Sequence, residues 1–213
     1  MPGKRCWLFL SLLLSSPAYA WTGISASIGE YDSDWRIDGE LRPITLTRYG
    51  IAIEDRTSAG LRLGVAVGEF GLRLKSADGT QSDDYSGEYL DLRLRWPLRL
   101  NSLLTLHGDF GYAWQSGRLS DDGSSDDGIN WSRSRFGLGL DVKLGMVSLR
   151  PFVEWRSLDG DVDLGGTRRL FENEKQTGGG VVIDLQVDPS GLVRFTWFSE
   201  GQTGLVLSFV RTY

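Results

Sequence analysis

The chain contains one cysteine, one histidine and six prolines among its 213 residues. The single cysteine, Cys6, excludes an intramolecular disulfide, and the single histidine, His107, excludes a metal site built on two histidines. A formal net charge of −5 is not that of a nucleic-acid-binding protein, whose surface is basic. Beyond residue 20 no long run of uncharged apolar residues occurs, so we expect no membrane-spanning helix.

Residues 1–20 have the organisation of a secretory signal peptide. A basic pair precedes an apolar stretch at residues 7–14, and Ala18 and Ala20 form a small-residue cleavage site. The apolar stretch is too short to span about 30 Å of hydrocarbon as a helix. We therefore expect cleavage after Ala20 and a single domain over residues 21–213.

The rest of the chain alternates between apolar and polar residues with the period of a β-strand. In "EYLDLRLRWPLRL" (residues 88–100) leucine and tryptophan occupy every second position, with Asp91, Arg93 and Arg95 between them. The same pattern recurs at residues 61–67, 103–115, 135–144 and 181–187. It predicts an all-β fold. A soluble sandwich, with its charged face in water, and a transmembrane barrel, with its apolar face in lipid, both fit the alternation.

The lengths of the connections separate these two folds. We expect ten strands, at residues 22–31, 41–53, 59–75, 88–98, 103–115, 132–145, 148–157, 177–187, 192–199 and 204–213. The connections after odd-numbered strands are long (32–40, 76–87, 116–131 and 158–176), except 200–203, whereas those after even-numbered strands (54–58, 99–102, 146–147 and 188–191) are short. Short periplasmic turns and long outer loops are typical of transmembrane barrels. The sequence therefore predicts an antiparallel up-and-down transmembrane β-barrel of ten strands, with eight as the alternative.

The chain ends in "GLVLSFVRTY", an alternating strand with an aromatic last residue. Leu205, Leu207 and Phe209 share one face with Tyr213. Aromatic rings elsewhere fall near strand ends, where headgroup-level rings are common in membrane barrels. We expect Trp21, Trp96 and Tyr213 near the periplasmic boundary, and Trp114, Trp131, Phe136 and Trp155 toward the outer one.

This ending resembles the C-terminal signal that bacterial outer-membrane barrels present to the barrel-assembly machinery. The chain from residue 21 onward is similar to the small monomeric barrels of the OmpA/OmpX type. The resemblance implies a monomer without cofactor in the outer membrane of a Gram-negative bacterium. Its partners would be outer-membrane lipids and lipopolysaccharide, the assembly machinery during biogenesis, and no nucleic acid.

The charged face of the predicted strands would line the lumen of such a barrel. Side chains of both signs occupy it: Asp91, Arg93, Arg95, His107, Asp109, Arg135, Asp141, Lys143, Glu154 and Arg156. Opposite charges on neighbouring strands can pair and fill space together. We expect His107 to bond a neighbouring carboxylate, with Asp109 on the same face, and the lumen to be filled by side chains.

Asp159, Asp161 and Asp163 alternate within a predicted outer loop, in the spacing that opens an EF-hand calcium loop. Leu164 and Leu170 stand where that loop requires glycine and glutamate. These three aspartates are thus a weak metal candidate, and a solvated acidic loop is the expected reading.

The leading functional hypothesis is a structural or surface-interaction barrel that is not an enzyme. A narrow channel for small polar solutes is the alternative from another class. A third hypothesis is an outer-rim hydrolase similar to lipid A deacylases or omptin-like proteases. That activity would need a histidine at the outer rim, whereas His107 closely follows a predicted periplasmic turn.

Overall fold

The computed structural model describes residues 21–58, 60–76, 82–120, 127–164, 166–199 and 201–213. The predicted signal peptide lies outside this part of the chain. No helix in it is long and apolar enough to cross a membrane.

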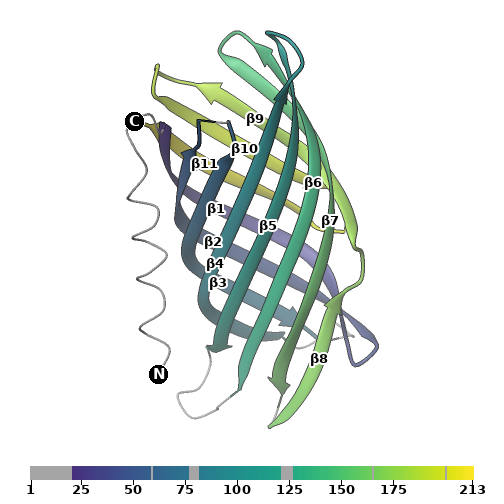
Figure 1. The fold of residues 1–213 in the computed structure, drawn as a ribbon. Helices are drawn as coiled ribbons and strands as arrows, with labels where there is room; N and C mark the ends of the chain where they lie inside the picture. Colours follow the sequence, from purple (N-terminus) through teal and green to yellow (C-terminus); the bar gives the residue numbers. More distant parts are fainter. Residues whose placement is uncertain (1–20, 59, 77–81, 121–126, 165, 200) are drawn as a thin grey trace.

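Strands make up almost all of the described chain (Figure 1). They are β1 (Trp21–Ile37), β2 (Glu40–Arg56), β3 (Arg62–Lys75), β4 (Ser82–Arg99), β5 (Leu104–Leu119), β6 (Gly128–Leu144), β7 (Val147–Leu164), β8 (Thr167–Asn173), β9 (Thr177–Gln186), β10 (Gly191–Ser199) and β11 (Thr203–Thr212). All pairings between neighbouring strands are antiparallel.

The sheet closes into a barrel because its last strand pairs with its first. Gly23 to Asp32 of β1 lie opposite Thr212 to Thr203 of β11, and the Tyr213 N–H donates to the Thr22 carbonyl at 2.9 Å. Ten strands, β1–β7 and β9–β11, form this closed wall. The predicted ten-stranded antiparallel barrel is confirmed. The start of β1 and the end of β11 lie together at one end, which we assign to the periplasm (Figure 1).

The opposite end of the barrel is narrower, because the short strands β9, β10 and β11 end before reaching it. There β8 takes their place and pairs with the end of β7 from Asp159 to Leu164. It also pairs with the end of β1, where Trp35 to Ile37 meet Asn173 to Phe171. The barrel wall thus contains ten strands at the periplasmic end and eight at the outer end. The expectation of a loop over 158–176 was wrong, since most of that segment is strand.

The other predicted outer loops are also shorter than expected. Residues 32–40, predicted as a loop, form the ends of β1 and β2 around a two-residue turn at Asp38 and Gly39. Both turn residues have positive φ, 50° and 86°, which is the geometry of the tight hairpin turn that Asp-Gly favours. The strands therefore continue well beyond the length that a membrane requires, which is about 9–11 residues.

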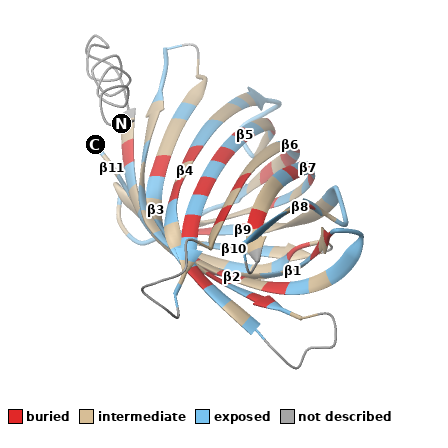
Figure 2. Cartoon of the chain, turned by 90° about the horizontal axis from the view of Figure 1, so that it is seen from below, coloured by how far each residue is buried: buried red, intermediate tan, exposed pale blue. Residues whose placement is uncertain are grey.

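An apolar belt surrounds the periplasmic half of the wall. Its outward side chains are exposed although they are large and hydrophobic, whereas the inward residues between them are covered (Figure 2). The belt comprises Ile24, Ile28, Tyr49, Ile51, Ile53, Leu63, Val67, Leu92, Trp96, Leu98, Phe110, Tyr112, Trp114, Phe136, Leu138, Val153, Trp155, Ile183, Leu185, Phe195, Trp197, Leu205 and Phe209. Such an apolar surface is suited to contact with lipid rather than water. The residues that point into the lumen are mostly polar, as in other transmembrane barrels.

The outer part of the wall reverses this polarity. We call it the outer collar: residues 30–37, 40–48, 69–75, 82–89, 115–119, 128–134, 157–164 and 167–173. On β3, for example, Leu63 and Val67 point outward within the belt, but Phe70, Leu72 and Leu74 point inward within the collar. The collar therefore has the polarity of a soluble barrel, with apolar residues inside and polar residues outside.

Aromatic rings fill the collar. Trp35 stacks on Phe171 of β8 with ring centroids 4.6 Å apart, and Trp131 meets Phe70 edge-on at 4.9 Å. We call the buried cluster around these rings the collar core: Trp35, Ile37, Ile44, Leu46, Phe70, Leu72, Leu74, Tyr85, Ile129, Trp131, Leu158, Val162 and Phe171. The expectation that Trp131 lies at headgroup level was wrong, because its side chain is 3% exposed and faces the lumen.

Candidate functional site

Below the collar core the lumen is lined by charged residues. Strand β4 contributes Asp91, Arg93 and Arg95, which alternate with outward leucines and so point inward. Asp91 is 2% exposed and accepts hydrogen bonds from Arg93 Nε at 3.3 Å and Nη2 at 3.0 Å. Arg48 of β2 approaches the same carboxylate at 3.9 Å and lies over the Tyr89 ring, 3.8 Å from its centroid. One buried carboxylate thus has two cationic neighbours.

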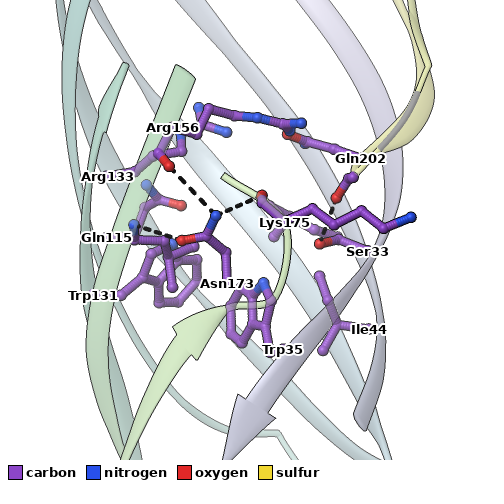
Figure 3. A pocket seen from close by; sticks show the side chains of 13 residues that line it. Ser33, Trp35, Ile44, Gln115, Trp131, Arg133, Arg156, Asn173, Lys175 and Gln202 are labelled. Atoms are coloured by element: carbon purple, nitrogen blue, oxygen red, sulfur yellow. Dashed lines mark hydrogen bonds between the residues drawn. The ribbon is translucent and has the colours of Figure 1, made fainter. Parts of the chain in front are cut away.

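Two further ion pairs lie along the wall of the lumen, one between adjacent strands and one within a strand. Arg95 donates from Nε to Asp109 of β5. Glu154 and Arg156, both on β7, form an ion pair at 3.3 Å. Arg156 also donates to the side-chain carbonyl of Gln202, beside the turn between β10 and β11. Figure 3 shows Arg156 and Gln202 extending toward each other in the lumen, near Trp35 and Trp131.

His107 lies in the periplasmic half of the lumen and is 2% exposed. Its Nε2 lies 3.6 Å from Asp141 Oδ2 on β6, not beside Asp109, which is paired with Arg95. Asp141 is also 3.8 Å from Arg150 of β7. The carboxylate that neighbours His107 is therefore on the adjacent strand, not two residues along its own strand.

The chain of charges then continues onto the strands next to the C-terminus. Arg150 approaches Asp184 of β9 at 3.7 Å, and Arg194 of β10 binds Asp184 through two donors at 2.6 and 2.8 Å. This two-donor geometry is the strong form of an arginine–carboxylate contact. Ionisable side chains from five strands, β5, β6, β7, β9 and β10, therefore form one connected group.

The structure places all but one of the predicted lumen residues within or beside this group. Lys143 is exposed near the periplasmic end of β6 and forms no ion pair with a described residue. Sequence reasoning missed several inward charges on strands whose apolar residues attracted attention instead: Arg48, Glu54, Arg62, Arg133, Arg150, Asp184 and Arg194. Except for Glu54, which precedes the outward Asp55, each stands between outward uncharged residues, so strict application of the alternation would have found them.

A central cavity of about 160 Å³ remains among these side chains. Its charged lining residues are Arg48, Arg93, Arg95, Asp109, Arg133, Arg135, Arg150, Glu154 and Arg194. Small residues of β1 and β11 form the opposite wall, among them Ser25, Ser27 and Ser208. A smaller cavity of about 50 Å³ lies on the periplasmic side of the central cavity. A third cavity, of about 30 Å³, lies on the outer side of the central cavity and is bordered by the collar core. The lumen of the belt region is thus polar and partly open.

The predicted assembly residues lie on the outer face of the closing strand. Leu205, Phe209 and Tyr213 are more than half exposed, and Leu207 is partly covered on the same face. Their backbone is fixed by pairing with β1 on one side and β10 on the other. The assembly role itself stays a prediction.

Changing Tyr213 to Asp should lower the amount of folded barrel in the outer membrane at least several-fold. The aromatic side chain is 73% exposed at the apolar edge, where a carboxylate would disfavour lipid contact and remove the terminal aromatic. Quantitative blotting of outer-membrane fractions measures the effect, with Tyr213→Phe as the matched control. Equal levels of the Asp variant and wild type would contradict the assembly role.

The three aspartates of the calcium hypothesis lie on the outward face of β7, in a strand rather than in a loop. Arg168 of β8 donates to Asp161 at 2.8 Å. No group of three or more potential ligands among histidine, cysteine and carboxylates converges within the described residues. A straight strand separates alternate residues by more than 6 Å, so the EF-hand geometry is not formed there.

The periplasmic turn "DPSG" at residues 188–191 has the local structure that its sequence predicts. Asp188 Oδ1 accepts hydrogen bonds from the Ser190 backbone N–H at 2.8 Å and from the Ser190 hydroxyl at 2.9 Å. These two bonds stabilise the carboxylate and lower the pKa of Asp188. The turn therefore stays charged and ordered at neutral pH.

Comparison with known proteins identifies the fold of the chain but not a family or a function. No model of a known protein family matches the chain, and no curated protein matches it. Among solved structures, the translocator domain of the autotransporter NalP from Neisseria meningitidis aligns with a TM-score of 0.51 and 13% identity, over 97% of this chain and 92% of that one. An outer membrane channel from Pseudomonas putida F1 aligns with a TM-score of 0.50 and 14% identity, over 93% and 97%. The chain has the fold of an outer-membrane β-barrel.

Proposed function

We propose that the protein is a barrel of the outer membrane that is closed at rest and acts through its outer surface. The observation that carries the proposal is the collar core. It occupies the outer end of the lumen with rings and aliphatic side chains of which Ile129, Val162 and Phe171 are 4% exposed or less. Close-packed rings exclude water and hydrated ions.

The position of the collar core disfavours the channel alternative. A solute that crossed the barrel along its axis would have to pass between Trp35, Trp131 and Phe171, whose ring centroids lie 4.6 to 6.4 Å apart. The Arg156–Gln202 hydrogen bond borders the same small cavity as Trp35 and Trp131 (Figure 3). A continuous wet path would need these contacts to separate.

The location of the histidine disfavours the rim hydrolase. His107 is the only histidine in the sequence and lies in the periplasmic half, against Asp141. A general base must be within hydrogen-bond reach of the proton it removes, and His107 is far along the strand from the outer rim. We therefore propose a function without catalysis.

The outside of the collar supports a surface-interaction role. Its described outward charges are mainly carboxylates (Glu30, Asp32, Asp34, Glu69, Asp84, Glu88, Asp159, Asp161, Asp163 and Glu172), with fewer cations (Arg36, Arg73, Lys75, Arg118 and Arg168). Leu170 adds an apolar contact point, 70% exposed on β8. A rigid acidic surface of this kind would meet cationic partners, or lipopolysaccharide through bridging divalent cations.

Single-channel recording in planar bilayers tests the closed state. We expect no conductance steps from the wild-type barrel, because the collar core blocks the lumen. Replacing Trp35, Trp131 and Phe171 together by alanine should produce steps, provided that heat-modifiable migration on gels shows a folded barrel. Frequent, reproducible steps from the wild-type protein would instead support the channel.

A further inference from the structure

The central cavity is strongly cationic. Among the described residues that line it are seven arginines and two carboxylates. Arginine stays protonated at any pH at which the barrel is folded. The positive charge in the cavity is therefore permanent and does not depend on the titration of a weak base.

Most of these arginines have a carboxylate partner in the wall. Arg93 binds Asp91, Arg95 binds Asp109, and Arg150 and Arg194 share Asp184. Glu154, the second carboxylate that lines the cavity, is paired with Arg156. These carboxylates of the lumen therefore already form ion pairs with other arginines.

Arg133 and Arg135 are the exceptions. Both point inward from β6, two residues apart, and neither forms an ion pair or hydrogen bond with a described residue. Arg135 lies over Gly111 of the neighbouring strand, where any Cβ would collide with the arginine side chain. A glycine at this position gives the guanidinium room to extend into the lumen.

Two other arginines that line the cavity also have unused donors. Arg48 is 6% exposed, and its Nε and Nη2 atoms have no hydrogen-bond partner among the described residues. Nη1 of Arg95 is likewise without a described partner. Excess positive charge and unsatisfied donors confined within a narrow lumen are unfavourable unless an opposite charge enters.

We propose that the central cavity binds a small oxyanion, such as a phosphate, sulfate or carboxylate group, between Arg48, Arg133 and Arg135. Guanidinium groups suit this ligand because their paired N–H donors match two oxygens of one anion. The volume of about 160 Å³ admits a small anion with a few waters and excludes a large one. This site is additional to the surface role proposed above.

The site opens toward the periplasm in this proposal. The central cavity and the 50 Å³ cavity below it share Ser25, Ala52, Ala66, Arg93, Arg194 and Val210 as lining residues. On the outer side the collar core closes the lumen. The ligand is therefore a soluble periplasmic anion rather than a component of the outer surface.

Charge-selective labelling tests the cavity directly. Cys6 is the only cysteine of the chain, so Ser25→Cys introduces a single thiol into residues 21–213, at the border of the two cavities. Rates of modification are measured in detergent with a methanethiosulfonate that carries a sulfonate and with one that carries a trimethylammonium. Ser102→Cys, in the exposed turn between β4 and β5, is the control. We expect the ratio of anionic to cationic rates to be about tenfold higher at position 25 than at position 102, because a cleft lined by one sign of charge concentrates opposite ions.

Two further measurements identify the arginines and the ligand class. In the Ser25→Cys background, Arg133→Gln with Arg135→Gln should return the rate ratio to that of position 102, and Arg118→Gln on the outer face should not change it. Millimolar inorganic phosphate should slow the anionic reagent at position 25 relative to chloride at equal ionic strength. Equal rate ratios at positions 25 and 102, an unchanged ratio in the double variant, or no protection by phosphate would each overturn the proposal.

Discussion

Replacing Trp131 with alanine should lower the free energy of unfolding by about 3–5 kcal/mol, the range measured for large-to-small changes at buried aromatic sites. Trp131 is 3% exposed and contacts Trp35, Phe70 and Phe171 through its ring. Its loss would remove the contacts of β6 with rings on three other strands, β1, β3 and β8, and would leave a cavity in the collar core. Urea titration of the barrel in lipid vesicles, followed by circular dichroism, measures the change.

Trp155→Ala is the matched control for this prediction. Trp155 belongs to the apolar belt, is 51% exposed and contacts Phe136 at 6.3 Å between centroids. Lipid can fill the space that its side chain leaves, so we expect a clearly smaller loss than for Trp131. If the two variants lost the same free energy of unfolding, packing in the collar core would stabilise the barrel no more than packing in the apolar belt does.

Alternation in the sequence was sufficient to predict the barrel, because its period reports the pleat directly. It did not reveal the collar, because the polarity of the two faces changes within a strand while the period does not. On β4, Leu90 and Leu92 point outward in the belt, whereas Tyr85 points inward in the collar and Asp84 outward. The apolar alternation along this strand begins only at Glu88, so the predicted strand began there, six residues after the true start of β4. A change of polarity without a change of period is the signal that would have extended it.

The lumen charges were predictable in type but not in pairing. Some pairs form between residues two apart on one strand, such as Asp91 and Arg93, and others between adjacent strands, such as Arg95 and Asp109. Alternation alone does not distinguish these two possibilities. His107 lies opposite Gly139, which has no side chain, and so reaches diagonally to Asp141. That register depends on where β5 and β6 begin, which periodicity does not determine. The pairing of β8 with β1 was not predictable from the sequence either, because it joins residues far apart in the chain.

The pairing of Asp91 has a large expected effect of its own. This carboxylate is 2% exposed and lies between Arg93 and Arg48, so it offsets the buried charge of Arg48 and the partly exposed charge of Arg93. Asp91→Asn keeps the shape of the side chain and removes its charge. We expect a loss of about 3–5 kcal/mol in the free energy of unfolding, the range for breaking a buried pair by removing one partner.

Asp84→Asn separates this effect from the general loss of a carboxylate. Asp84 pairs with Arg73 at 2.9 Å on the outside of the collar, where both side chains are half exposed or more. An exposed pair of this kind contributes little to stability and weakens with salt. Urea titrations of the two variants at low and high salt should therefore give a large, salt-insensitive loss for Asp91→Asn and a small, salt-dependent one for Asp84→Asn. An Asp91→Asn barrel as stable as wild type would show that the lumen arginines do not need this counter-charge, since water in the central cavity would then solvate them sufficiently.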